Sequence, residues 1–220
     1  MNKIKVKKIS DKKIWLDEIK SKGLTHPEVI KLDIMPWGGS YKPVTMAAIS
    51  YDDNGFNIYM RSYEKNIRFE GKERNDPVHL DSCMEFFISP VENNLAYFNF
   101  EINPLGTLYT GFCSTGLRKD SQKIENNLNK EYFDICAMSK KDAINYNENA
   151  DKNSYWEISY SVPFEYIKKY MPDFKPKGKM RANFYKCGDM TITEHYVVWN
   201  NIEVPEPDYH RPEFFGELEL

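Results

Sequence analysis

The feature that most constrains this fold is an alternation of apolar and polar residues with a period of two. It is clearest in the segments CMEFFIS (residues 83–89) and AYFNFEIN (residues 96–103). Successive side chains of a strand point to opposite faces of a sheet, so this alternation indicates strands with one face in a core. We expect the two segments to form a hairpin whose core face carries Met84, Phe86, Ile88, Phe98, Phe100 and Ile102.

Similar strand patterns recur along most of the chain, and helix signals are few. Further strands are expected at residues 29–37, 44–51, 56–63, 106–113, 133–138, 155–162, 179–187 and 195–201. Short helices are expected at residues 11–22, capped by Ser10, and at residues 163–171, which start with a proline. The Asn- and Lys-rich segments at residues 121–133 and 140–153 are interpreted as polar loops.

This pattern predicts an all-β fold, an antiparallel β-sandwich of the jelly-roll or immunoglobulin-like kind with one or two short helices. No internal repeat or linker divides the chain. We therefore expect one domain over residues 1–220, in which residues 1–28 form an N-terminal extension with the first helix.

Charge and hydropathy argue against nucleic-acid and membrane partners. The 30 basic and 33 acidic residues are interspersed, for a net charge of -3, so no one-sided basic surface is expected. No apolar run reaches the length of about 18 residues that a membrane helix needs. The opening MNKIKVKKISDKK lacks an apolar signal-peptide core, which predicts a cytoplasmic protein, or an extracellular one if a signal has been removed.

The four cysteines stand far apart in the sequence, at Cys83, Cys113, Cys136 and Cys187. Without a secretion signal, we expect all of them to be reduced thiols.

Two carboxylates are expected on the face of the hairpin opposite its core, because Glu85 and Glu101 alternate away from the phenylalanines. Cross-strand and diagonal neighbours lie about 5–8 Å apart. Such a pair fits a glycoside hydrolase, and it could equally bind sugar hydroxyls or a calcium ion. It could also be a pair of solvated surface carboxylates.

The end of the chain gathers Cys187, Asp189, Glu194, His195 and His210 around Trp199. Zinc sites commonly contain close ligand pairs, which are missing here, so no metal site is assigned. A nucleophilic Cys187 is possible in principle, but a buried inert thiol is the more frequent case.

The better signal is Trp199, followed by Asn200 and Asn201 at a strand end. It could offer an indole face and amides to a sugar, or it could be a core residue.

Several blocks of the sequence resemble one known family in their order along the chain. They are DSCMEFFISP, YFNFEINPLGTL, WEISYSVPF, NFYKCGD and HYVVWNNIEVPEPDYHRPEFFGEL. Together they are similar to the family 9 carbohydrate-binding-module-like proteins, from about Trp37 to Leu220.

The resemblance implies a sugar-binding β-sandwich in which two tryptophans clamp a terminal sugar and calcium is a structural aid. Trp199 matches the downstream tryptophan of the clamp. No tryptophan lies between Trp37 and Trp156, so the opposite face would come from Trp37, Tyr63 or another aromatic residue. Arginines that could orient the ligand are Arg181, Arg61 and Arg68.

The founding modules are attached to xylanases, so xylan and cellulose in polysaccharide catabolism are the ligands the resemblance suggests. This chain would be a stand-alone domain.

Three functions are therefore open at the level of sequence. The first is a non-catalytic carbohydrate-binding domain of weak affinity that requires no cofactor. The second is a glycoside hydrolase that acts through Glu85 and Glu101. The third is a haem-binding sandwich of the related DOMON-like kind, with methionine and histidine as axial ligands.

Overall fold

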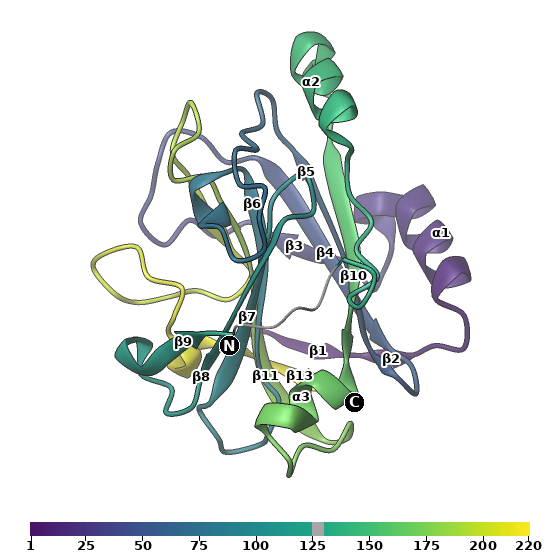
Figure 1. Cartoon of the computed structure of the whole chain (residues 1–220), viewed down its shortest axis with the longest axis vertical. Coiled ribbons are helices and arrows are strands. Elements are labelled where there is room, and N and C mark those ends of the chain that lie inside the picture. Colours follow the sequence, from purple (N-terminus) through teal and green to yellow (C-terminus); the bar gives the residue numbers. More distant parts are fainter. Residues whose placement is uncertain (125–129) are drawn as a thin grey trace.

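The computed structural model describes residues 1–124 and 130–220, and in it two β-sheets pack face to face (Figure 1). Eight strands form the larger sheet, in the order β1 (Lys3–Lys5), β13 (Gly216–Glu219), β11 (Lys179–Cys187), β6 (Cys83–Ser89), β7 (Tyr97–Ile102), β8 (Leu108–Cys113) and β9 (Ser121–Lys123), with β12 (Tyr196–Val198) also paired to β11. The smaller sheet has the order β10 (Trp156–Pro163), β5 (Gly55–Tyr63), β4 (Val44–Tyr51) and β2 (Lys7–Lys8), with β3 (Ile30–Leu32) also paired to β4.

The predicted sandwich is confirmed, with two parallel pairings at the edges. Strand β1 runs parallel to β13, and β2 runs parallel to β4, whereas the other strand pairs are antiparallel. The N-terminal residues expected as an extension thus contribute one strand to each sheet. No helix in the described part of the chain is long and apolar enough to cross a membrane.

The central hairpin β6–β7 has the register that the alternation predicts. Phe86 lies opposite Phe100, and Glu85 lies opposite Glu101. The apolar residues of that face are fully buried between the sheets, where the rings of Phe86 and Phe184 lie 4.9 Å apart. The two glutamates therefore point away from the smaller sheet, onto the outer face of the larger one.

Helix α1 (Lys12–Lys22) covers the outer face of the smaller sheet (Figure 1). Trp15 and Ile19 pack there against Met46, Ala48 and Tyr59. The helix is capped by Asp11, whose Oδ1 accepts a hydrogen bond from the Ile14 amide at 2.9 Å, and not by Ser10 as the sequence suggested.

Helix α3 (Phe164–Tyr170) lies where it was expected, but helix α2 (Lys140–Asn149) replaces part of a predicted polar loop. The Ser139 Oγ accepts a hydrogen bond from the Asp142 amide at 3.1 Å and donates one to the Asp142 carboxylate at 2.6 Å. This is a capping arrangement that the motif Ser-x-x-Asp could have revealed. Its polar side chains anchor it, since the amide of Asn147 donates to the Ile67 carbonyl at 2.8 Å.

Other differences from the predicted elements are shorter strands. Residues 29–37 contain only β3, and residues 133–138 contribute only an isolated bridge between Cys136 and Ser159. In the predicted loop at residues 121–133, residues 121–123 form strand β9, while residues 125–129 lie outside the described residues.

A second apolar layer lies on the outer face of the larger sheet. Phe87, Tyr97 and Tyr185 project from β6, β7 and β11 into it, and Tyr209 and Phe215 close over them from the end of the chain. Figure 1 shows this late segment, in yellow, looping out on the side of the larger sheet away from α1. The glutamates of the hairpin lie beneath this cover.

The four cysteines are free, as predicted, and only Cys136 is exposed. A thiol reagent should therefore modify Cys136 rapidly in the native protein and all four cysteines in denaturant without reductant. Counting modified thiols against time checks this prediction. Fewer than four in denaturant would reveal a disulfide, and loss of the rapid phase in Cys136→Ser would confirm its assignment.

Candidate functional site

A cavity of about 390 Å³ opens on the outer face of the larger sheet. Its size lies within the range of about 300–1,000 Å³ that is usual for small-molecule sites. Strands β6, β7, β8 and β11 form its floor, and residues 75–79 and 207–210 form its rim. Polar side chains that line it include Glu85, Glu101, Asp189, Asp208, Arg118 and His79.

Two buried carboxylates form the polar centre of this cavity. Glu85 is 2% exposed and Glu101 is 5% exposed, and they are direct cross-strand neighbours. Burial raises the pKa of Glu101 to about 7 and raises that of Glu85 well above its ordinary value, with the neighbouring Cys187 and Glu101 adding to the second shift. Each carboxylate is therefore held where ionisation is unfavourable.

Few protein groups compensate these carboxylates. The Asn99 amide donates to Glu101 Oε1 at 2.7 Å, and His79 Nδ1 lies 4.0 Å from Glu101 Oε2. Glu85 Oε1 accepts a hydrogen bond from the Cys187 thiol at 3.0 Å, and no cationic side chain of the described residues forms an ion pair with Glu85. Buried carboxylates normally have stronger partners, so their free acceptor positions point to a ligand.

Aromatic rings form the wall beside the carboxylates. Tyr109, Tyr196 and Tyr209 line the cavity. Tyr209 is held rigidly, because its ring stacks on Tyr185 with centroids 4.1 Å apart and its hydroxyl donates to the Lys186 carbonyl at 3.1 Å. Apolar ring faces next to hydrogen-bond acceptors are the combination that binds a sugar ring.

Trp37 lies behind this wall and outside the cavity lining. Its ring is 5.8 Å from that of Tyr196 and 5.9 Å from that of Tyr209, measured between centroids, and its Nε1 donates to the Val204 carbonyl at 2.8 Å. Trp37 thus positions the two tyrosines that line the cavity.

The expectation of an exposed Trp199 is wrong. The indole is only 6% exposed and lies in the core, with its ring centroid 5.9 Å from that of Phe184. Gly216 is close beneath it, since a Cβ there would meet the indole at 2.6 Å. The residues of β12 that face the outer apolar layer are Tyr196 and Val198, so the predicted alternation holds but Trp199 lies on the inner face of the sheet.

The other predicted ligand residues also lie outside the cavity. Asn200 is buried and structural, since its side chain accepts from the Asn2 amide at 2.7 Å and donates to the Phe214 carbonyl. Asn201 is exposed. Arg181 donates to the carbonyls of Glu213 and Phe215 at 2.8 and 2.7 Å.

The remaining aromatic and arginine candidates belong to other parts of the sandwich. Arg61 pairs with Glu157 at 2.9 Å, and Arg68 pairs with Asp81. Tyr63 packs on Tyr155, at the opposite end of strand β5 from its turn.

The cluster near the end of the chain divides between the two faces of the larger sheet. Cys187, Asp189 and His210 line the cavity. His195 lies on the other side, where its Nε2 is 2.7 Å from Lys186 Nζ, which is in turn 3.1 Å from Glu64 Oε2. A nucleophile and base formed by Cys187 and His195 is therefore absent.

The sequence model of Carbohydrate-binding family 9 matches residues 23–220. The chain belongs to this family. Curated proteins gave no match. The match covers both carboxylates, the tyrosines of the wall and the closing segment. As a member of this family, the protein is a non-catalytic carbohydrate-binding domain.

Solved structures similar to this chain show the same fold. A candidate carbohydrate-binding protein from Bacteroides uniformis is 23% identical, with a TM-score of 0.78 over 99% of this chain and 98% of that one. A family 9 module from Caldicellulosiruptor kristjanssonii in complex with glucose is 10% identical, with a TM-score of 0.56 over 99% and 95% of the two chains. The same kind of module in complex with cellotriose is 11% identical, with a TM-score of 0.56 over 99% and 93%.

These comparisons give the hydrolase alternative no support, because the family and the similar structures are all described as carbohydrate-binding. Structural calcium stays a prediction. Among the described residues, the one group of three or more histidine, cysteine or acidic side chains close enough to share an ion is Cys83, Glu85 and Cys187.

Sequence reasoning found the carboxylates of the cavity but missed its wall. The closing block PDYHRP contains Asp208, Tyr209 and His210, and the strand before Trp199 contains Tyr196. Their aromatic and polar composition was the available signal. The loop that brings them over the sheet has no periodicity from which its position could be predicted.

Proposed function

We propose that the outer-face cavity is the sugar-binding site and that it takes a neutral glucose-type sugar unit. The observation that carries this proposal is the pair of buried carboxylates, Glu85 and Glu101, which face a cavity walled by tyrosines. A site of this kind offers what a sugar needs, namely fixed acceptors for hydroxyl groups and an apolar face for the ring.

The carboxylates would accept hydrogen bonds from adjacent hydroxyls of one sugar ring. Hydrogen bonds to a charged group contribute about 1.5–3 kcal/mol each, more than neutral ones. The ring of Tyr209, fixed against Tyr185, or that of Tyr196 would cover the apolar face of the sugar. Either glutamate, when ionised, would repel an anionic ligand, and a second buried charge would add to the cost of burial, so a neutral sugar is favoured over a uronic acid.

The ligand class comes from similar proteins. Modules of this fold from Caldicellulosiruptor kristjanssonii bind glucose and cellotriose. We extend this to the present chain as glucose and short β-glucan oligosaccharides, with xylan and cellulose as the polymers to test. A single stacked ring and a few hydrogen bonds, reduced by the entropy of association, correspond to dissociation constants of about 10 μM to 1 mM.

Calorimetric titration with glucose, cellobiose and cellotriose tests this proposal. At pH 8, above the pKa of about 7, Glu101 is a charged acceptor; Glu101→Gln keeps the size of the side chain but removes this charge, so we expect at least about a tenfold loss of affinity, or about 1.4 kcal/mol. Glu217→Gln is the matched control, because Glu217 lies on β13 in ion pairs with Lys3 and Lys179, away from the cavity. It should bind as the unaltered protein does.

Two results would contradict the proposal. One is unchanged sugar affinity in both Glu85→Gln and Glu101→Gln. The other is release of reducing sugar from cellobiose or xylan that stops in these variants, which would restore the hydrolase reading.

A further inference from the structure

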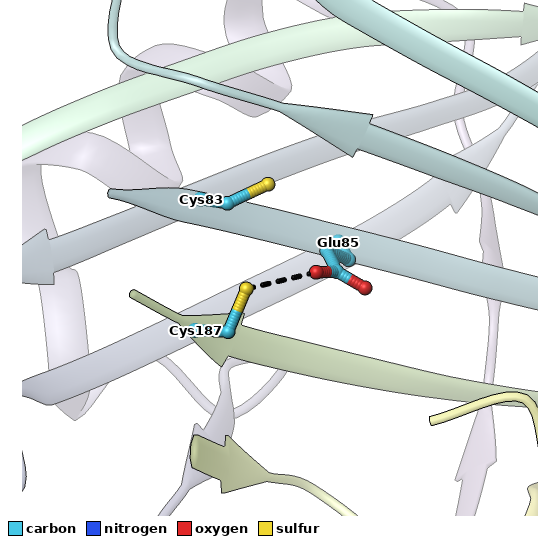
Figure 2. Close-up of side chains that lie close together, drawn as sticks. All are labelled: Cys83, Glu85 and Cys187. Atoms are coloured by element: carbon cyan, nitrogen blue, oxygen red, sulfur yellow. Dashed lines mark hydrogen bonds between the residues drawn. The ribbon is translucent and has the colours of Figure 1, made fainter. Parts of the chain in front are cut away.

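At the floor of the cavity, Glu85 and Cys187 lie next to the buried thiol of Cys83, and the function proposed above uses only the carboxylate. Cys83 starts β6, Cys187 ends β11, and the two are direct cross-strand partners. Glu85 lies on the same face of β6, two residues after Cys83, and Figure 2 shows its carboxylate beside the Cys187 sulfur. The Cys83 and Cys187 Sγ atoms and one Glu85 oxygen all lie within 4.8 Å of one another.

We propose that Cys83, Cys187 and Glu85 bind a thiophilic divalent metal ion of the zinc class. In a tetrahedral zinc site, Zn–S bonds of about 2.3 Å and Zn–O bonds of about 2.0–2.2 Å place neighbouring ligand atoms about 3.5–3.8 Å apart. The 3.0 Å contact between Cys187 Sγ and Glu85 Oε1 is somewhat shorter than this spacing, so the two groups already lie close enough to share an ion. The remaining separations, each at most 4.8 Å, need only small side-chain rotations.

The surroundings leave the three groups available to an ion. The Cys187 thiol has weak protein partners, the Glu85 oxygen and the His79 carbonyl at 3.6 Å. Glu85 forms no ion pair among the described residues, so a cation would compensate a buried carboxylate that the protein leaves without one. On binding, the two thiols lose their protons to solvent, as does the Glu85 carboxyl where it is protonated, and no oxidation or reduction occurs.

The fourth position of such an ion faces the cavity, because Cys187 and Glu85 line it. Three protein ligands with one open position are typical of zinc sites that admit a water or ligand oxygen. Thiolate ligands select zinc, cobalt or cadmium over calcium and magnesium, which prefer oxygen. The inference does not rest on the proposed sugar binding, because the sulfur atoms define the ion whether or not a sugar enters.

Cobalt(II) reports this site directly, since thiolate coordination gives a charge-transfer band in the near ultraviolet. We expect the reduced, metal-free protein to develop this band on titration with Co²⁺ and to lose it when Zn²⁺ is added. The band should be abolished in Cys187→Ser and strongly reduced in Glu85→Gln. Cys113→Ser and Cys136→Ser are matched controls, a buried and an exposed cysteine outside the cluster, and should keep it.

A competition titration with a zinc-chelating dye gives a second measurement. The affinity for Zn²⁺ should fall at least tenfold in Cys187→Ser and in Cys83→Ala, whose folding is checked by thermal melting. Absence of the cobalt band in the reduced protein would overturn the proposal. Its persistence in Cys187→Ser would do the same, because the ion would then sit elsewhere.

Discussion

Replacement of Lys186 by methionine is expected to lower the free energy of unfolding by about 3–5 kcal/mol. Lys186 is fully buried between the sheets, where its Nζ lies 3.1 Å from Glu64 Oε2 and 2.7 Å from His195 Nε2. Glu64 is also buried and accepts hydrogen bonds from Trp156 Nε1 and Ser82 Oγ, both at 2.9 Å. Methionine would leave that carboxylate buried without its cation.

Lys179→Met on the same strand is the matched control. Lys179 is exposed and pairs with Glu217 at 3.5 Å on the surface, so its loss should change stability by less than about 1 kcal/mol. Urea denaturation of the three proteins measures both effects. A change under about 1 kcal/mol in Lys186→Met would mean that the Lys186–Glu64 pair contributes nothing to the fold.

As the pH rises from 4.5 to 8, the free energy of unfolding of Glu101→Gln is expected to increase relative to that of the unaltered protein, by about 3 kcal/mol in all. The pKa of Glu101 is about 7 in the folded protein, because the side chain is buried, against an ordinary value of 4.5. Between these two values the folded state holds a proton that the unfolded state has lost. The contribution of Glu101 to the free energy of unfolding is therefore fully present below pH 4.5 and is lost as the pH rises to about 7.

The measurement is the difference in unfolding free energy between variant and unaltered protein at pH 4.5 and at pH 8, with a chelator present to exclude metal ions. His195 and His210 have pKa values lowered to about 4, chiefly by burial, which makes the fold less stable in acid. Both proteins contain them, so their contribution cancels in this difference. A difference that is independent of pH would contradict the raised pKa of Glu101.

Glu157→Gln is the matched control, and its expected effect on stability near pH 7 is opposite to that of Glu101→Gln. Burial opposes the ionisation of Glu157, but hydrogen bonds from Tyr59, Lys20 and Arg61 outweigh it and lower the pKa. This carboxylate stabilises the fold when ionised, so its replacement should destabilise the protein near pH 7. The two variants thus distinguish a carboxylate that stabilises the fold when ionised, Glu157, from one that destabilises it, Glu101. Carboxylates of the second kind are typical of ligand sites.

The hairpin shows how much of the structure could be predicted from the sequence. Alternation fixed which residues of β6 and β7 share a face, and apolar rings on one side decided which face is buried between the sheets. Glu85 and Glu101 followed as neighbours on the other face. Their burial did not follow, because it comes from the segment at residues 202–215, which returns from far along the chain to cover them.

Trp199 shows where this reasoning fails. In HYVVWNN both faces carry apolar or aromatic residues, so the alternation gives two face assignments that the sequence cannot distinguish. Trp199 faces the core because its indole packs against Phe184 and because Gly216 has no side chain to occupy the same space. Tyr196 consequently faces the cavity, and the aromatic wall is made of tyrosines.

A crystal structure of the protein soaked with cellobiose tests the central claim most directly, since it locates the sugar without any substitution. The account predicts a sugar ring in the outer-face cavity, with its hydroxyls within hydrogen-bond distance of Glu85 or Glu101 and its apolar face against Tyr196 or Tyr209. A sugar seated elsewhere would contradict it, for example in the separate cavity lined by Tyr41 and Tyr63 with the outer-face cavity free of sugar.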